Sequence, residues 1–233
     1  MRSHRFKPTF RCDRIEKRAY DGSERGGGVA ERRRTRGPGA HHERRRAEIA
    51  DAVLAIVADR GLTAVSLTEV AAQAGISPGR VQHYFPAKRQ LVEAAFDRGN
   101  ELSSLRIRER VGNELDAADP RLVLTTVLTE LIPYDATTEA HMRVRQSFQA
   151  FAFADETIAA RLRVLYARFH RQMADLISKE QESGRVRADL DAAGVALVLV
   201  ALAEGLAAYV LTGVTPAGVA RDRLLAEIAA LYG

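Results

Sequence analysis

The chain has 233 residues, of which 46% are hydrophobic and 28% charged, and it holds one cysteine, Cys12. A chain of this length can bury a substantial core, and a single cysteine excludes an internal disulfide and favours a reducing compartment. Residues 1–46 hold 15 Lys or Arg against 6 Asp or Glu, whereas the rest of the chain holds 20 against 24. A basic end on a mildly acidic body is typical of a protein that contacts phosphate at one end only.

Residues 1–43 are rich in Arg and Gly, show no sustained hydrophobic period and contain GGG at 26–28 and GPG at 37–39. They are predicted to form a disordered basic arm. Two interpretations stay open: the arm lies along a DNA groove, or it is a solvated tail, in part from a wrongly assigned start codon. Because the N-terminus has no apolar run, we expect no secretory signal and a cytoplasmic protein. Three arginines beside the arm are candidate DNA contacts: Arg44, Arg45 and Arg46.

Two short helices about a tight turn are predicted after a first helix over about 43–59. Ser66 is a good N-cap, and Glu69 three residues later completes a capping box. Gly75 stands where the first of the two short helices must end, at a position that favours the left-handed conformation. This pattern is typical of a helix–turn–helix.

The second short helix is predicted to begin after Ser77, an N-cap followed by a proline in the first turn. Val81 and Phe85 are four residues apart, so both are expected to pack inward. The polar side chains between them are left on or beside the outer face, where they can contact a partner: Arg80, Gln82, His83 and Tyr84.

The segment also resembles the DNA-binding signature of the TetR (tetracycline-repressor) family, A-x-x-A-G-[IV]-S-x-G-x-[VL]-x-x-Y-F-x-x-K-x-x-L. The resemblance covers roughly residues 46–91. Two positions depart from it: Gln82 stands where the family commonly has Tyr, and Ala87 where it has a capping Ser or Asn. The matching residues are Ala71, Ala74, Gly75, Ile76, Ser77, Gly79, Val81, Tyr84, Phe85, Lys88 and Leu91.

The resemblance implies that the second helix enters the major groove while neighbouring groups hold phosphates. Gly79 has no side chain, so backbone and DNA can come close. Arg80 can make a bidentate contact to guanine, and Gln82 can pair with adenine or hold a phosphate. The expected phosphate contacts are Ser66, Thr68, Tyr84 and Lys88, although Ser66 and Ser77 are first of all helix caps; whether His83 contacts DNA stays open.

The rest of the chain shows helical periodicity and no strand-like alternation, so we predict an all-α fold of nine helices. A three-helix DNA-binding domain over residues 44–91 is followed by a ligand-binding and dimerisation domain over residues 92–233, a division that the TetR resemblance also implies. The six later helices are predicted over about 87–110, 120–132, 137–154, 156–183, 190–212 and 216–232.

Residues 192–211 form an apolar stretch as long as a membrane span. Glu204 lies near its middle, and a carboxylate costs about 2.5–3.5 kcal/mol in lipid on insertion scales. We therefore favour a buried bundle helix and expect no membrane partner. The last two helices carry more apolar surface than one small domain needs, which favours a homodimer through a four-helix bundle over packing within one chain.

A ligand pocket among the later helices is implied by the resemblance, and the sequence only hints at its lining. Gln146 and Gln149 share a face of one helix with Met142, and Tyr166 and His170 are neighbours on the next helix. Glu204 needs a partner within its apolar stretch, and we favour an arginine across the dimer over a cationic ligand. The C-terminal half faintly resembles the betaine-regulator subgroup, in residues 184–190 and 202–207.

The leading hypothesis is a ligand-responsive repressor that binds a palindromic operator in double-stranded DNA as a homodimer and is released by a small-molecule effector. The alternative is a small-molecule sensor or carrier whose helix–turn–helix serves protein contacts, for which Gln82 is the one supporting feature. An enzyme is not expected, because the sequence has no Gly-rich phosphate loop and no paired Cys/His spacing. We predict no cofactor and no metal site.

Overall fold

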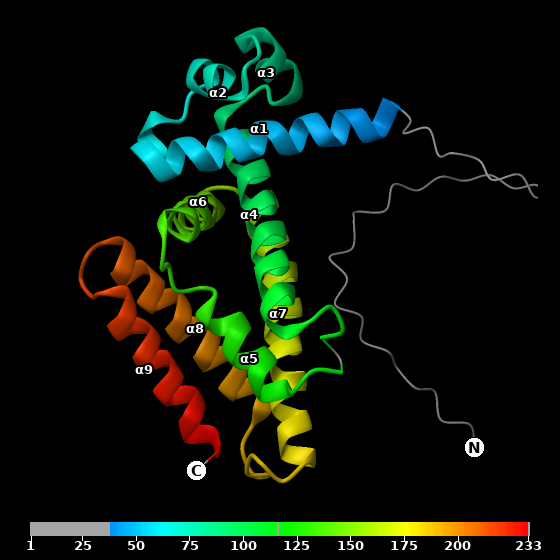
Figure 1. Ribbon diagram of the computed structural model, residues 1–233, viewed down its shortest axis with the longest axis vertical. Coiled ribbons are helices and arrows are strands. Elements are labelled where there is room, and N and C mark those ends of the chain that lie inside the picture. The colour runs from blue at the N-terminus through cyan, green and yellow to red at the C-terminus, as the bar shows by residue number, and fades with distance from the viewer. Residues whose placement is uncertain (1–37, 116, 233) are drawn as a thin grey trace, which may run out of the picture.

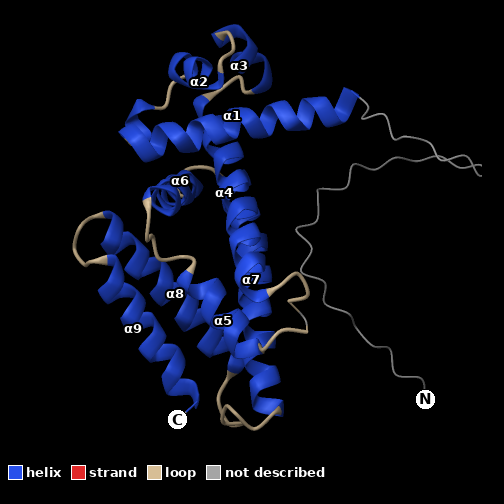
Figure 2. Cartoon of the chain, viewed as in Figure 1, coloured by secondary structure: helices blue, strands red, loops and turns tan. Residues whose placement is uncertain are grey.

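A computed structural model of the chain describes residues 38–115 and 117–232. These residues form nine α-helices and two short 3-10 helices and contain no strand, which confirms the predicted all-α fold (Figure 2). The predicted arm falls almost entirely on residues 1–37, which lie outside the described residues.

The first helix, α1 (Pro38–Arg60), begins five residues before the predicted start at 43. Residues 38–43 are therefore helical, which corrects the end of the predicted arm. A proline is tolerated at the first position of a helix, where no amide donor is needed. Arg44 and Glu48, four residues apart, form an ion pair at 3.0 Å that further supports this part of the helix.

The helix–turn–helix consists of α2 (Leu67–Ala74) and α3 (Pro78–Tyr84), as predicted. Gly75 ends α2 with a φ of 63°, a conformation that glycine adopts without strain. Both helices lie on one side of α1 at one end of the molecule (Figure 1).

The fourth helix, α4 (Lys88–Val111), runs from the helix–turn–helix into the rest of the molecule. Its N-cap Ala87 has no side-chain acceptor, and Gln90 Oε1 compensates in part by accepting from the Ala87 amide at 3.2 Å. The predicted domain boundary at 91/92 therefore falls inside a continuous helix. The apolar core around α1–α4 also contains Phe148 and Leu162 from later helices, so the two predicted domains share one core.

Five further helices complete the fold, and a second apolar core joins four of them. Asp155 caps the third of these, as predicted, by accepting from the amides of Thr157 and Ile158. In Figure 1, α6 crosses beneath α1, while α8 and α9 lie toward the opposite end from α3. The helices are α5 (Pro120–Thr129), α6 (Ala136–Ala152), α7 (Glu156–Glu182), α8 (Ala192–Leu211) and α9 (Ala217–Ala229).

The apolar helix α8 is long and apolar enough to span a bilayer, yet it packs against α7 and α9 in a bundle. Only 28% of it is buried within the single chain. The predicted buried bundle helix is thus only partly covered by its own chain. Leu197, Val198 and Tyr209 on α8 and Val219 on α9 are more than half exposed.

Candidate nucleic-acid interface and buried polar clusters

The outer face of α3 is polar and exposed. Arg80, Gln82 and His83 are all exposed, and no side-chain hydrogen bond or ion pair ties Arg80 to the described residues. A Cβ added to Gly79 would meet no atom within 4 Å, so packing within the chain does not require glycine there. This face is thus open to an external partner.

Both predicted serine caps form, but the predicted capping box does not, because the Glu69 carboxylate pairs with Arg60. Ser66 Oγ accepts from the Glu69 amide at 3.1 Å, and Ser77 Oγ accepts from the Arg80 amide at 3.2 Å. Both hydroxyl groups therefore stabilise helix starts, and both residues are exposed. Thr68 on α2 and Lys88 at the start of α4 are also exposed, on either side of α3 in the sequence.

The three arginines at the start of α1 differ in their contacts. Arg44 and Arg45 pair with Glu48. Arg46 instead donates to the Tyr84 carbonyl at 3.0 Å, and its guanidinium lies 4.3 Å from the centroid of the Phe85 ring. Arg46 therefore holds α1 against the end of α3, a structural role that the sequence did not indicate. The half-buried Tyr84 packs between the rings of His42 and His83.

Charged contacts also join α4 to the start of α7. Arg161 pairs with Glu93 and Asp97 of α4, and Arg89 pairs with the capping residue Asp155. Burial raises the pKa of Asp97, which Arg161 opposes. The first half of α4, which follows directly on α3, is thereby tied to the C-terminal helices.

A partly buried polar group, the Glu204 cluster, joins three helices and consists of Arg145, Gln149, Tyr166 and Glu204. Arg145 Nε and Nη2 lie 3.0 and 2.7 Å from Glu204 Oε1, and Gln149 Nε2 lies 3.1 Å from Oε2. The Tyr166 hydroxyl donates to Oε1 and accepts from Gln149. Burial raises the pKa of Tyr166 to about 12, so the phenol stays protonated and donates.

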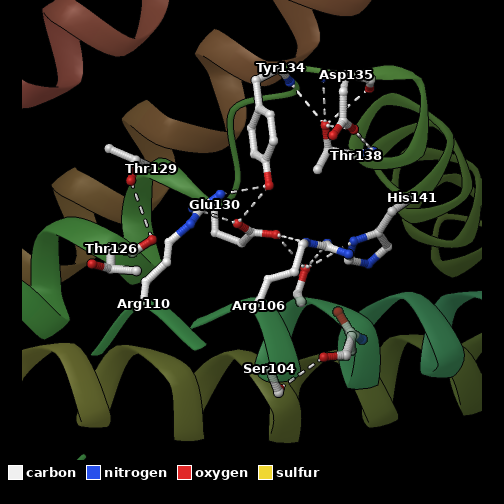
Figure 3. A network of polar contacts seen from close by, with 12 residues as sticks. Ser104, Arg106, Arg110, Thr126, Thr129, Glu130, Tyr134, Asp135, Thr138 and His141 are labelled. Carbon is white, nitrogen blue, oxygen red and sulfur yellow. Dashed lines mark hydrogen bonds and ion pairs between the residues drawn. The ribbon is translucent and has the colours of Figure 1, made fainter. Parts of the chain in front are cut away.

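A second polar group, the Glu130 cluster, lies between α4, α5 and α6 (Figure 3). The Glu130 carboxylate is 2% exposed and accepts from Arg106 Nε at 2.6 Å and from Arg110 Nη1 at 3.1 Å. Ser103 Oγ lies 3.4 Å from Glu130 and 3.2 Å from His141 Nδ1. The other hydroxyl near Glu130 is that of Tyr134, at 3.4 Å.

His141 is held in its neutral form within this cluster. Burial lowers its pKa to about 3, and the nearby cations Arg145 and Arg106 act in the same direction. Its ring packs on the backbone of α4, where a Cβ at Gly99 would overlap the imidazole. Glycine at position 99 thus permits α6 to approach α4 closely.

The predicted ligand residues are only partly brought together. Gln149, Tyr166 and Glu204 meet in one cluster, whereas Gln146 is half-buried outside it and His170 only approaches the Tyr166 ring, at 5.8 Å between centroids. Glu204 has the favoured arginine partner, but it comes from α6 of the same chain. Two surface hollows, of about 420 and 350 Å³, border the first half of α4 and are not lined by the Glu204 cluster.

The sequence did not indicate that Arg145 pairs with Glu204, and it did not indicate the Glu130 cluster. One signal was available: Glu130 interrupts an apolar run over residues 122–132, just as Glu204 interrupts its own. A carboxylate in such a run needs a partner. The arginines themselves carry no comparable signal, because they lie in ordinary amphipathic helices.

Two family models match most of the described chain. The model for bacterial regulatory proteins of the tetR family matches residues 49–95, which hold the helix–turn–helix. The model for the C-terminal domain of BetI-type transcriptional repressors matches residues 120–233. The second match agrees with the faint resemblance to the betaine-regulator subgroup.

Similar proteins are named as helix–turn–helix transcriptional regulators. The HTH-type transcriptional regulator PksA of Bacillus subtilis is 28% identical over 78% of this chain and 85% of its own length. The HTH-type transcriptional regulator BetI of Rhizobium meliloti is 33% identical over 50% of this chain and 48% of its own length.

Solved structures agree in fold. A TetR-family regulator from Rhodococcus sp. superposes with a TM-score of 0.68 at 27% identity, over 82% of this chain and 100% of that one. A transcriptional regulator from Saccharomonospora viridis, in complex with choline, superposes with a TM-score of 0.69 at 25% identity, over 80% and 96%. An exposed polar α3, the two matched models and these relatives agree: the chain belongs to the tetR family of bacterial regulatory proteins, as a non-enzymatic, DNA-binding transcriptional regulator with a BetI-type C-terminal domain.

Proposed function

We propose that this protein is a ligand-responsive repressor in the cytoplasm, which binds a palindromic operator as a homodimer and is released by a small-molecule effector. The observation that carries the proposal is the exposed outer face of α3, where Arg80 and Gln82 have bidentate donor or acceptor groups free for base edges. Lys88 and Thr68 lie exposed beside this face and serve as phosphate contacts.

The homodimer is supported by the uncovered apolar surface of the last two helices. Leu197 and Tyr209 on α8 are 52% and 55% exposed, and Ala201 and Gly205 between them leave room for a second helix to approach closely. A two-fold pairing of α8 and α9 would bury this surface in a four-helix bundle. Two copies of α3 would then contact two half-sites of a palindrome.

The effector is proposed to bind among the C-terminal helices and to favour the state that does not bind DNA. The Saccharomonospora viridis relative in complex with choline supports a small organic molecule with a positively charged group as the effector class. The alternative of a carrier with a helix–turn–helix for protein contacts depended on Gln82, which is exposed, as Arg80 is, and suits a DNA contact equally well.

The proposal is tested by fluorescence anisotropy with DNA selected from random duplexes by the purified protein. We expect the selected sites to be palindromic. An Arg80→Ala variant should bind the selected site more weakly and lose preference at one base pair of each half-site, an effect of about 1–3 kcal/mol. A Lys88→Ala variant should weaken binding to all duplexes and reduce the slope of affinity against salt by about 1.

The matched control is Arg171→Ala, which removes an exposed positive charge from α7. It should leave the salt slope and the base preference unchanged. If Arg80→Ala and Lys88→Ala behave like this control, α3 and the start of α4 do not contact DNA and the proposal is wrong.

A further inference from the structure

Four donors converge on a single carboxylate in the Glu204 cluster. Two are the Nε and Nη2 atoms of Arg145, and the others are the Gln149 amide and the Tyr166 hydroxyl. The donors come from α6 and α7, whereas the carboxylate comes from α8. A guanidinium edge, an amide and a phenol are the groups with which proteins bind a free carboxylate.

The cluster is largely buried and its pair of charges sums to zero. The side chains of Arg145 and Glu204 are 11% and 18% exposed. Removing two charges from water costs free energy that their attraction repays only in part, so an ion pair at this place is weak evidence for stability. Within the described residues, no other acidic side chain contacts Arg145.

We propose that the Glu204 cluster binds a small zwitterion, whose carboxylate replaces that of Glu204 on Arg145, Gln149 and Tyr166 and whose ammonium group pairs with the displaced Glu204. This rests on the proposed ligand-responsive function and names the chemical class of its effector. In the absence of ligand, the side chain of Glu204 occupies the carboxylate position.

Charge balance selects a zwitterion over a simple ion. A monocation that took Glu204 would leave Arg145 buried without an anion, and a monoanion that took Arg145 would leave Glu204 buried without a cation. Either arrangement leaves one uncompensated charge in a poorly hydrated place. A ligand that carries both charges keeps each member of the pair partnered, at the cost of separating α8 from α6.

Separation of these helices acts on α4 as well. Arg145 Nη1 lies 3.4 Å from Asn100 Oδ1 on α4, and His141, one turn before Arg145, packs on Gly99. A change at Arg145 therefore reaches the helix that follows directly on α3.

The test is isothermal titration calorimetry of the full chain with ω-amino acids from glycine to 6-aminohexanoate, with butylamine and butanoate as singly charged counterparts of 4-aminobutanoate. We expect at least one ω-amino acid to bind the wild type at least tenfold more tightly than either counterpart. The Arg145→Gln variant, which leaves Glu204 alone, should instead prefer butylamine. The Glu204→Gln variant, which leaves Arg145 alone, should prefer butanoate.

A third variant keeps the test decisive should either charge variant fail to fold. Tyr166→Phe removes one carboxylate donor without changing charge, and it should weaken ω-amino acid binding several-fold. The proposal is overturned if no ω-amino acid binds the wild type at millimolar concentration, if a folded charge variant ranks the ligands as the wild type does, or if Tyr166→Phe binds ω-amino acids as tightly as the wild type. Anisotropy on the selected DNA without ligand separates the two proposals: intact DNA binding with no ligand preference contradicts the zwitterion alone.

Discussion

Two buried regions of this molecule differ in the side chains that they contain. Around α1–α4 the buried side chains are apolar, with Phe85, Val81 and Leu91 almost fully enclosed. Between α4, α5, α6 and α8 the interior also encloses Glu130, His141 and Arg145. Close-packed apolar side chains leave little room for a second arrangement, so this core holds α3 in a fixed position. Hydrogen-bonded charges can exchange partners, so the second interior is where we propose that a ligand changes the structure.

The largest expected effect comes from a substitution in the apolar core around α1–α4. Phe148 of α6 is fully buried and stacks on Phe96 of α4, with 4.5 Å between ring centroids. Phe148→Ala should lower the free energy of unfolding by about 3–5 kcal/mol, because it removes buried apolar surface and leaves a cavity. Urea denaturation followed by circular dichroism measures the loss.

The control for that substitution is Phe153→Ala, at the end of the same helix, where the side chain is 93% exposed. It should change the free energy of unfolding by no more than about 0.5 kcal/mol. Equal effects of the two substitutions would contradict the core assigned to α6.

A smaller effect is expected in the polar region, where the free energy of unfolding should depend on pH through His141. Burial lowers the pKa of His141 to about 3 in the folded state, from its ordinary value of 6.5. Between these values the unfolded chain binds a proton that the folded chain does not, so stability is full above pH 6.5 and falls as the pH drops toward 3. By linkage the loss at pH 5 is about 2 kcal/mol relative to pH 8.

Comparison with a His141→Phe variant isolates this contribution. Phenylalanine fills a similar volume on Gly99 and does not titrate. The free energy of unfolding of the wild type minus that of the variant should therefore fall by about 2 kcal/mol on going from pH 8 to pH 5. A difference independent of pH would show that His141 is not buried as a neutral group.

Short-range signals made the DNA-binding half predictable. Ser66, Gly75 and Ser77 act within three or four residues of themselves, so their caps and turn follow from the sequence and agree with the structure. The start of α1 was predicted too late, because the glycines and proline at 37–39 indicate a turn. No local signal shows that the helix already begins at Pro38. Asp155 was predictable for the same short-range reason.

The polar interior depends on partners far apart in the chain. Arg145 and Glu204 are 59 residues apart, and Arg106 and Glu130 are 24 apart. A carboxylate in an apolar run indicates that a partner is needed, but the sequence does not indicate which arginine is that partner. The sequence predicts only a DNA contact for Arg46 for a related reason, since its contact with Tyr84 of α3 exists only after folding.

The central claim is that the buried Arg145–Glu204 pair serves a change of state and not the stability of the fold. The most direct measurement is the free energy of unfolding of the Arg145→Met, Glu204→Leu double variant, with DNA binding measured on the same protein. Since a buried ion pair replaced by apolar side chains of similar size is commonly neutral or stabilising, we predict a stability within about 1 kcal/mol of the wild type or above it, with DNA binding retained. A loss of about 3 kcal/mol or more would contradict the claim and assign the pair to the fold.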